Sequence, residues 1–440
     1  MKLAVVVQRY GADLNGGAEL HARYIAERLS QYAIVEILTT CASDYITWRN
    51  ELSPGIDNVN GIAVHRFPVR KERDPADFGY WSQRVFERTH SLSDELRWLK
   101  SEGPTSPALI RQISRSINDY DYFLFFSYRY FHAYHGIRAV SSRAVLIPTA
   151  ERDHALGLTI FGQTFRGVRA LMYNSYEERA LIQGVSKNYD IPGVVVGIGS
   201  DVPARGSAQR FRARAQISKP FALYVGRIDE NKGCVEMFDF FQRYLQHISK
   251  ELHLVLIGNP VIPIPAHPHI HHLGFVTDEE KFDAMAAADL LIMPSYFESL
   301  SMVTLEAWAM GLPVLVNGNC DVLRGQTIRA NAGLYYENYE EFSEALHTLE
   351  THKSLWRHFS RNGRAYFDEH YTWRTIEQKY LAMFERLKQE DQTGISRQIE
   401  PLPSWLSRYR RNQLPARAIV DQLPSGPILT SSDGHNPLPI

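Results

Sequence analysis

The chain has 440 residues, of which 44% are hydrophobic, and its formal net charge is -1. At roughly 100–200 residues per domain, this length indicates two or three domains, each with enough apolar residues for its own core. The balanced charge lacks the strong basic excess of nucleic-acid-binding proteins, so we expect no nucleic-acid partner.

The cysteines and the apolar runs indicate where the protein works. Cys41, Cys234 and Cys320 are odd in number, far apart and without metal-ligand spacing, which favours a reduced compartment. The first apolar run is too short for a signal-peptide core, and no run reaches the ~18–20 residues needed to cross a bilayer. We therefore expect a cytoplasmic protein. Aromatic and basic residues at 80–100 and 405–411 leave a peripheral contact with the inner face of a membrane open, and the oligomeric state is not predicted.

The first half of the chain alternates short apolar runs with longer amphipathic segments. A strand at 3–7 and a glycine turn at Gly16-Gly17 precede a stretch with apolar residues at helical spacing. Further strands are expected at 35–39, 62–67, 122–126, 144–147, 170–174 and 194–198. Continuous apolar strands separated by helices are typical of a parallel sheet covered on both faces.

The same pattern restarts after a polar, basic linker at 199–219. Strands are expected at 221–225, 252–257, 272–276, 290–293 and 313–316, and helices at 235–249, 279–287, 304–310, 339–349, 354–369 and 372–387. The sequence thus predicts an α/β fold with two Rossmann-like, doubly wound domains that face a cleft. Their expected bounds are 1–203 and 204–372, followed by a crossover helix at 373–390 that packs back on the first domain. A disordered tail is expected at 391–440, where Pro, Ser, Gln and Arg replace periodic apolar residues.

The strongest functional signal is the segment from Pro294 to Val314. A strand ends at Pro294, a polar loop follows, and a helix begins near Ser301. Such a helix start presents unpaired N–H groups to an anion. Glu298 in the loop and Glu306 in the helix place two carboxylates where they can accept hydrogen bonds from sugar hydroxyls, so the segment suits a sugar that carries an anionic group.

This segment resembles the Glu-x7-Glu motif of the retaining GT-B glycosyltransferases of family 4, the glycosyl transferases group 1, and Gly311-Leu312-Pro313-Val314 resembles the turn that follows it there. The resemblance covers about residues 1–387. It implies that Glu298 contacts the transferred sugar and that Glu306 holds the nucleotide ribose. The backbone that it implies for sugar and diphosphate binding comprises Ser299, Leu300, Ser301 and Met302.

Two further loops of the second half match the same family. Gly226-Arg227, with Lys232 five residues on, resembles its Gly-Arg and Lys-Gly loop, and a diphosphate leaving group without a bound metal needs fixed cations of this kind. Gly274-Phe275-Val276 resembles the turn that lines the base pocket, so Val276 is a candidate substrate contact. In the first half, Gly16 and Gly17 resemble the family's glycine loop, where backbone can approach a ligand closely.

The loop after the strand at 144–147 departs from the family. Many relatives place a His directly after Pro-Thr-Ala, but here Glu151 stands at that position and His154 comes three residues later. Glu151, Asp153 and His154 are therefore all candidates for the catalytic role of that loop.

The resemblance implies a metal-independent, retaining hexosyltransferase that uses a UDP- or GDP-linked sugar as donor and needs no cofactor. The acceptor is expected to be a glycan or a lipid-linked glycan, with capsule, lipopolysaccharide and other surface polysaccharides all open. Three alternatives remain: a sugar-nucleotide epimerase of the same fold, a non-catalytic sugar-nucleotide-binding module, and a dinucleotide oxidoreductase. The missing Gly-x-Gly-x-x-Gly turn counts against the oxidoreductase. A histidine-rich stretch at 267–272 precedes an apolar strand, so we expect no metal site there.

Overall fold

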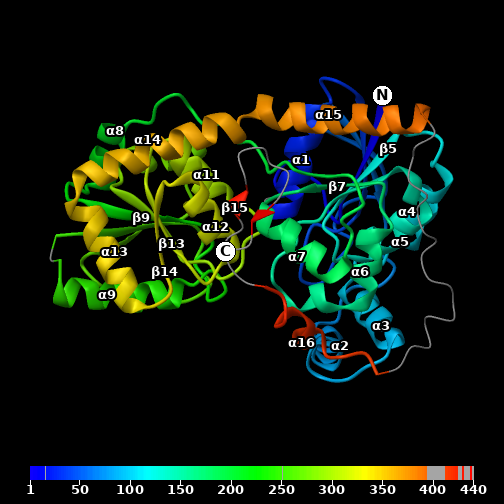
Figure 1. The fold of residues 1–440 in the computed structure, drawn as a ribbon, viewed down its shortest axis with the longest axis horizontal. Coiled ribbons are helices and arrows are strands. Elements are labelled where there is room, and N and C mark those ends of the chain that lie inside the picture. The colour runs from blue at the N-terminus through cyan, green and yellow to red at the C-terminus, as the bar shows by residue number, and fades with distance from the viewer. Residues whose placement is uncertain (15, 250, 394–411, 425–428, 431–436, 439–440) are drawn as a thin grey trace. The chain divides into compact units, whose positions relative to one another are not determined.

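The computed structural model describes residues 1–14, 16–249, 251–393, 412–424, 429–430 and 437–438. The chain divides into two compact units (Figure 1). The N-terminal unit comprises residues 1–197 and 377–424, and the C-terminal unit comprises residues 198–376 together with the described residues after 424.

The N-terminal unit is built on an eight-stranded sheet in the order β3-β4-β2-β1-β5-β6-β7-β8. All neighbouring strands are parallel except β3, which runs antiparallel to β4. The strands are β1 (Lys2–Val6), β2 (Ile34–Thr40), β3 (Gly55–Val59), β4 (Ile62–Phe67), β5 (Tyr122–Phe126), β6 (Ala144–Ile147), β7 (Ala170–Tyr173) and β8 (Gly193–Val195). The central strand β1 pairs with two neighbours, so that Val5 lies beside Ile37 and Leu124.

Helices cover this sheet and bury its central strands along their length, as the five buried residues of β5 show. The helices are α1 (Gly17–Leu29), α2 (Pro75–Glu87), α3 (Leu92–Glu102), α4 (Pro107–Arg115), α5 (Phe131–Ala139), α6 (Thr159–Arg166), α7 (Tyr176–Ser186) and α16 (Ala416–Val420), with short 3-10 turns η1 (Ser141–Arg143) and η2 (His154–Gly157). The long helix α15 (Trp373–Gln392) belongs to this unit from Glu377 onward.

The C-terminal unit has a six-stranded, all-parallel sheet in the order β11-β10-β9-β12-β13-β14. Its strands are β9 (Phe221–Val225), β10 (His253–Ile257), β11 (Ile270–His272), β12 (Leu290–Met293), β13 (Val314–Asn317) and β14 (Gly333–Tyr336). Its helices are α8 (Ala208–Ala215), α9 (Cys234–His247), α10 (Asp278–Ala287), α11 (Met302–Ala309), α12 (Asp321–Ala330), α13 (Tyr339–Thr351) and α14 (Lys353–His370), and two short strands, β15 (Leu429–Thr430) and β16 (Pro437–Leu438), pair with each other.

Several elements differ from the sequence-based expectation. The segment expected as a linker contains α8, whose Phe211 is buried against Phe221 at the start of β9. The strand expected at 272–276 instead ends at His272, because Gly274 has a φ of +73°, which a strand does not use. The strands β3 and β14 were missed, and β3 carries no strong apolar signal because four of its five residues are exposed.

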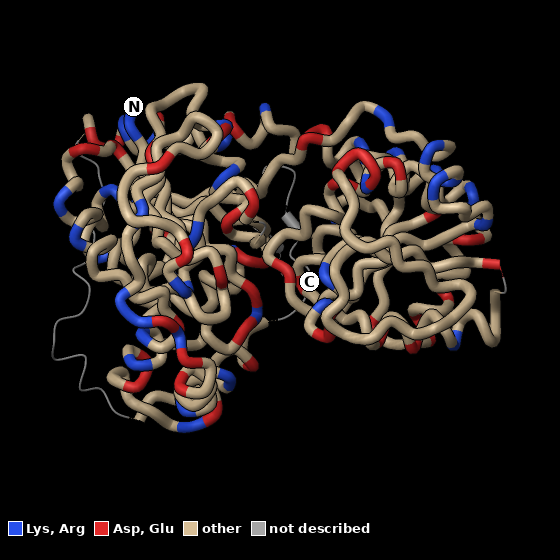
Figure 2. The backbone as a smooth tube through the Cα atoms, turned by 180° about the vertical axis from the view of Figure 1, so that it is seen from behind, with Lys and Arg blue, Asp and Glu red and all other residues tan. Residues whose placement is uncertain are grey.

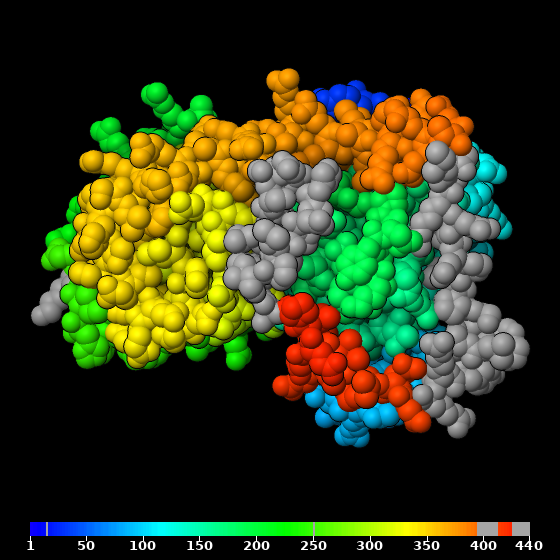
Figure 3. Space-filling view, viewed as in Figure 1, coloured from blue at the N-terminus to red at the C-terminus, as the bar shows by residue number. Residues whose placement is uncertain are grey.

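The tail also differs from the expectation that residues 391–440 are disordered. Helix α15 extends to Gln392, and residues 412–424 form an ordered segment that contains α16. Ala416 and Val420 of this segment are buried in the core of the N-terminal unit, which explains why it is ordered. Figure 3 shows this segment, in red, lying on the N-terminal unit beside α2.

Charged residues of both signs occur in both units (Figure 2). Figure 2 shows Lys and Arg interspersed with Asp and Glu over both units. No helix in the described part of the chain is both long and apolar enough to cross a membrane. The aromatic and basic residues at 405–411 lie outside the described residues.

Candidate active site

Two loops of the C-terminal unit meet at the carboxyl ends of the neighbouring strands β9 and β12. One loop leads from Gly226 to Gly233 and into α9, and the other leads from Pro294 to Ser301 and into α11. Their backbones approach closely, because a Cβ atom added at Gly233 would lie 2.0 Å from the carbonyl oxygen of Pro294. The φ of Gly233 is +72°, so both the contact and the backbone require glycine here. The carboxyl edge of an open parallel sheet is where such folds bind ligands.

This approach brings two of the predicted catalytic residues into contact. The Nζ atom of Lys232 donates to Oε1 of Glu298 at 2.7 Å. The Lys232 side chain is 30% exposed and that of Glu298 is 12% exposed, so the pair is partly accessible to solvent. The two residues are 66 positions apart in the chain, and the sequence predicted a role for each without predicting this contact.

Asp229 joins the two predicted cations of the first loop. Its Oδ1 atom accepts from the backbone N–H of Lys232 at 2.8 Å, and its Oδ2 atom is ion-paired with the Arg227 guanidinium. The carboxylate is buried, whereas the Arg227 side chain is 48% exposed. The sequence reasoning missed Asp229, although an acidic residue between an Arg and a Lys in a loop is a detectable signal. Gly226 at the start of the loop has a φ of +152°.

The start of α11 has no side-chain cap. Ser301 has a φ of +67°, and its side chain does not cap the helix but bonds to the Thr304 hydroxyl at 2.9 Å. Leu300 is buried, while Ser299 and Met302 are partly exposed. The amides of the first turn therefore receive no acceptor from the Ser301 side chain, and groups of this kind bind phosphate oxygens favourably.

Glu306 is buried within α11 and is held by two groups that the sequence did not predict. Its carboxylate accepts from Lys281 Nζ at 2.9–3.0 Å and from the Ser200 hydroxyl at 2.9 Å. Burial alone would lower the pKa of Lys281, but the carboxylates of Glu306 and Asp278 outweigh that effect and raise it. Lys281 comes from α10, 25 residues away, and nothing in its sequence context indicates the pairing.

The predicted base-pocket residue Val276 lies at the wall of a cavity. This cavity has a volume of about 240 Å³ and is also lined by Phe211, Ile257 and Leu273. Charged residues also line it, among them Arg210 and Asp283, which are paired with each other. Val276 therefore lies in a cavity lined by both apolar and charged residues, and its role in base binding stays a prediction.

In the N-terminal unit, the glycine loop sits on a buried ion pair. Gly16 caps α1, and a Cβ atom added there would lie 2.2 Å from Glu19 Oε2. Glu19 is buried and accepts from the Arg9 guanidinium at 2.7 Å. A Cβ atom at Gly17 would meet nothing within 4 Å. The structure thus gives a packing reason for glycine at position 16, and no such reason at position 17.

The three candidates in the loop after β6 have different environments. Asp153 caps η2 and accepts from the Tyr128 hydroxyl at 3.0 Å and from Arg129 at 2.6 Å. His154 is partly exposed and packs edge-on against Phe86 at 5.7 Å. Glu151 is partly exposed as well. Both oxygens of Asp153 are engaged in positioning, so its environment favours a supporting role over proton transfer.

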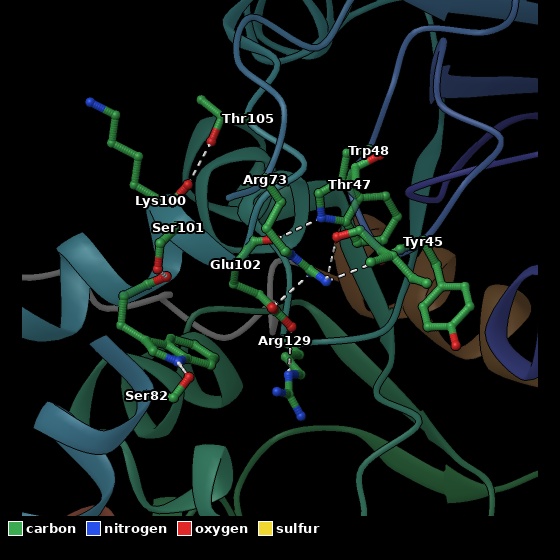
Figure 4. A network of polar contacts seen from close by, with 12 residues as sticks. Tyr45, Thr47, Trp48, Arg73, Ser82, Lys100, Ser101, Glu102, Thr105 and Arg129 are labelled. Carbon is green, nitrogen blue, oxygen red and sulfur yellow. Dashed lines mark hydrogen bonds and ion pairs between the residues drawn. The ribbon is translucent and has the colours of Figure 1, made fainter. Parts of the chain in front are cut away.

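Arg129 links this loop to the buried carboxylate of Glu102. Its Nε atom donates to Glu102 at 2.7 Å, and the other oxygen of Glu102 pairs with Arg73 at 2.8 Å (Figure 4). The Arg73 guanidinium lies 4.8 Å from the ring centroid of Trp48. Burial would lower the pKa of Arg129, but Glu102 and Asp153 outweigh that effect and hold it above its ordinary value. Alternating charges therefore fix the loop to α3.

The loop is also held by Glu178, a buried carboxylate. Its ionisation is expected to make the stability of the N-terminal unit depend on pH. Glu178 accepts from the backbone N–H groups of Ala150 and Asn174, and burial raises its pKa to about 8. Between about pH 4.5 and 8 the folded protein then holds a proton that the unfolded chain has lost, so stability falls as pH rises. The expected slope is up to about 1.4 kcal/mol per pH unit.

Denaturant unfolding of the wild type and of Glu178→Gln at pH 5, 6.5 and 8 measures this dependence. The amide variant cannot ionise and is expected to lose less stability over the interval. Buried His21 and His132, whose pKa values burial lowers to about 3 and about 4, act below pH 6.5 in both proteins and cancel in the difference. Equal pH profiles for the two proteins would contradict the assignment.

No group of three or more His, Cys, Asp or Glu residues in the described part of the chain is placed to hold a metal ion. In the histidine-rich stretch, His269 and His271 stack on His253 with ring centroids 4.4 and 4.9 Å apart.

Comparisons with known proteins found one matching family model and several similar proteins. Residues 207–366 match the family model described as glycosyl transferases group 1. Mannosylfructose-phosphate synthase of Agrobacterium fabrum is 25% identical over 195 residues, which are 40% of this chain and 43% of that protein. The chain therefore spans less than half the length of this relative. D-inositol 3-phosphate glycosyltransferase of Streptomyces bingchenggensis is 24% identical over 404 residues, which are 81% of this chain and 82% of that protein.

The fold is shared with solved structures. The structure of Anabaena Alr3699/HepE in complex with UDP-glucose matches with a TM-score of 0.61 and 15% identity, covering 88% of this chain and all of that one. At this identity the likeness shows a common fold of two parallel-sheet α/β domains.

Proposed function

We propose, from the match of residues 207–366 to the glycosyl transferases group 1 and from the GT-B fold of the chain, that this protein is a glycosyltransferase that takes a sugar from a nucleotide-diphosphate sugar. The observation that carries the proposal is the contact between Lys232 and Glu298 at the paired ends of β9 and β12. It lies within the matched residues and beside the start of α11, where an anion is favoured.

The charges of this site suit the departure of a diphosphate. When the bond between sugar and diphosphate breaks, negative charge grows on the leaving oxygen, and Lys232 and Arg227 are positioned on one loop to stabilise it. Glu298 and Asp229 hold these two cations in place before the donor binds. Because the charges are fixed in advance, little reorganisation is needed at the moment of reaction.

The finer features of the reaction follow the family resemblance. We propose transfer with retention of configuration, without a metal ion or other cofactor, from a UDP- or GDP-linked hexose. The structure of Anabaena Alr3699/HepE contains UDP-glucose, which favours a UDP-linked over a GDP-linked donor. The acceptor is a glycan or a lipid-linked glycan, which would place the enzyme in surface-polysaccharide synthesis at the cytoplasmic side of a membrane. The names of both curated relatives include a phosphorylated small molecule, so such acceptors belong in the same screen.

Transfer that survives chelation is the test of this function. Purified protein is incubated with UDP- and GDP-sugars and an acceptor panel, with and without EDTA, and the products are separated and their anomeric configuration determined. We expect a retained glycosidic product at an unchanged rate in EDTA, because Arg227 and Lys232 supply the positive charge. Activity lost in EDTA and restored by Mn²⁺ would contradict the metal-independent mechanism. An isomerised nucleotide sugar without acceptor product would indicate an epimerase, and binding without turnover would indicate a non-catalytic module.

A further inference from the structure

The C-terminal segment 412–424 contacts the predicted catalytic loop of the N-terminal unit. Arg152 lies between Glu151 and Asp153 in that loop, and its guanidinium donates to the carbonyl oxygens of Val420 at 3.4 Å, Leu423 at 3.3 Å and Pro424 at 2.6 Å. These carbonyl groups lie at and after the last residue of α16, where helix carbonyls have no intrahelical donor. The bond to Pro424 has the short length of a charge-assisted hydrogen bond, and the two bonds to Val420 and Leu423 are long.

A second contact lies at the other end of the same loop. A Cβ atom added at Gly157 would lie 2.1 Å from the carbonyl oxygen of Ala416, so α16 rests directly on the backbone of η2. Ala416 is fully buried and Val420 is 3% exposed. Their burial against the apolar core supplies the favourable free energy that holds the segment in place.

The segment is anchored by a third, independent set of contacts. Gln413 and His90 exchange both backbone hydrogen bonds, at 2.8 and 3.1 Å. The Gln413 side chain also accepts from the Thr159 hydroxyl at 3.1 Å, at the start of α6. The segment is therefore held in part by contacts outside the loop, at His90 and Thr159, and Arg152 adds a direct contact between the segment and the loop.

We infer that residues 412–424 are a positioning segment for the loop 149–157, and that Arg152 is the positioning residue through which they act. Glu178 and Arg129 hold the loop from inside the unit, at Ala150 and Asp153, and the segment holds it from the outside, between those two points. Without the outer contact, Glu151 and His154 lose the fixed backbone between them. The inference rests on the proposed function only for its kinetic readout.

The experiment compares the full-length variants Arg152→Met and Arg152→Lys with Arg417→Ala as the matched control. Arg417 lies on the same segment, but its side chain is 56% exposed and pairs with Glu87 and Asp421 rather than with the loop. Amide hydrogen exchange is followed in peptides that cover 149–157 and 412–424. The rates of donor turnover and the affinity for nucleotide diphosphate are measured beside it.

Arg152→Met is expected to speed exchange in both peptides by roughly tenfold, because one charged hydrogen-bonding group is lost. It should lower kcat by roughly 10- to 100-fold, as displacement of positioned groups does, while the affinity for nucleotide diphosphate stays unchanged. Arg152→Lys keeps a cation and should recover part of both effects, and Arg417→Ala should match the wild type.

Wild-type exchange rates in Arg152→Met would show that Arg152 does not hold the loop to the segment. Faster exchange with a wild-type kcat would show that this contact does not position the loop for catalysis. If the wild-type protein itself transfers no sugar, the proposed function fails, and the exchange measurement alone then decides whether the segment positions the loop.

Discussion

Replacing Lys232 by alanine is expected to lower kcat by roughly 100- to 1000-fold, the cost of removing one fixed donor from a developing oxyanion. Arg227→Ala is expected to act in the same range. In the structure both cations are tied to carboxylates of the C-terminal unit, Lys232 to Glu298 and Arg227 to Asp229. Their proposed work is on charge that grows only in the transition state, so substrate binding should change much less than kcat.

The thermal stability of the two variants distinguishes a catalytic role of Lys232 and Arg227 from a structural one. The Lys232 and Arg227 side chains are 30% and 48% exposed, and partly exposed ion pairs contribute roughly 0–1 kcal/mol to folding. Lys219→Ala is the matched control, because Lys219 pairs with Glu251 in the same unit but precedes the amino end of β9, away from the carboxyl ends of β9 and β12. The measurement is kcat beside a thermal melting curve for all three variants. Wild-type kcat in both test variants, or a fall in kcat that only follows a fall in folded protein, would remove this loop from the mechanism.

Glu298→Gln and Glu306→Gln are expected to fail in different ways. Glu306 is buried and is predicted to hold the ribose, which does not react. Its loss should therefore weaken the binding of free nucleotide diphosphate. The loss of one charged hydrogen bond costs roughly 1.5–3 kcal/mol, which is about a 10- to 150-fold rise in Kd. Glu298 is predicted to contact the sugar that moves, so its amide variant should bind free nucleotide diphosphate normally and lose kcat.

Calorimetric titration of nucleotide diphosphate, with initial rates for the same samples, distinguishes the two roles. Lys281→Met belongs in the series, because Lys281 pairs with Glu306 and the variant leaves that carboxylate buried without its cation. If Glu306 acts on the ribose directly, Lys281→Met should weaken binding less than Glu306→Gln does. Equal losses of nucleotide affinity in Glu298→Gln and Glu306→Gln would contradict the role assignment. No effect of either variant on binding or rate would remove the main support for a glycosyltransferase.

Much of the architecture was predictable because it depends on local patterns. Fully buried strands such as β5, β6, β9 and β12 are continuous apolar runs, and their bounds match the expectation. The α/β fold of two parallel-sheet domains and the resemblance to glycosyl transferases group 1 are both confirmed. The site roles stay predictions, although two of the predicted residues, Lys232 and Glu298, prove to be in contact.

Local sequence patterns predicted the apolar strands, the glycine turns and the polar loop before α11. Only the tertiary structure decided the contacts between distant residues, such as Lys281 and Ser200 with Glu306 or Arg152 with the segment at 412–424. The tail was expected to be disordered because its composition is polar and rich in proline, yet Ala416 and Val420 in one part of it are buried in the core of the N-terminal unit. The physical reason is that burial and pairing depend on which surfaces the fold brings together, and no window of neighbouring residues contains that information.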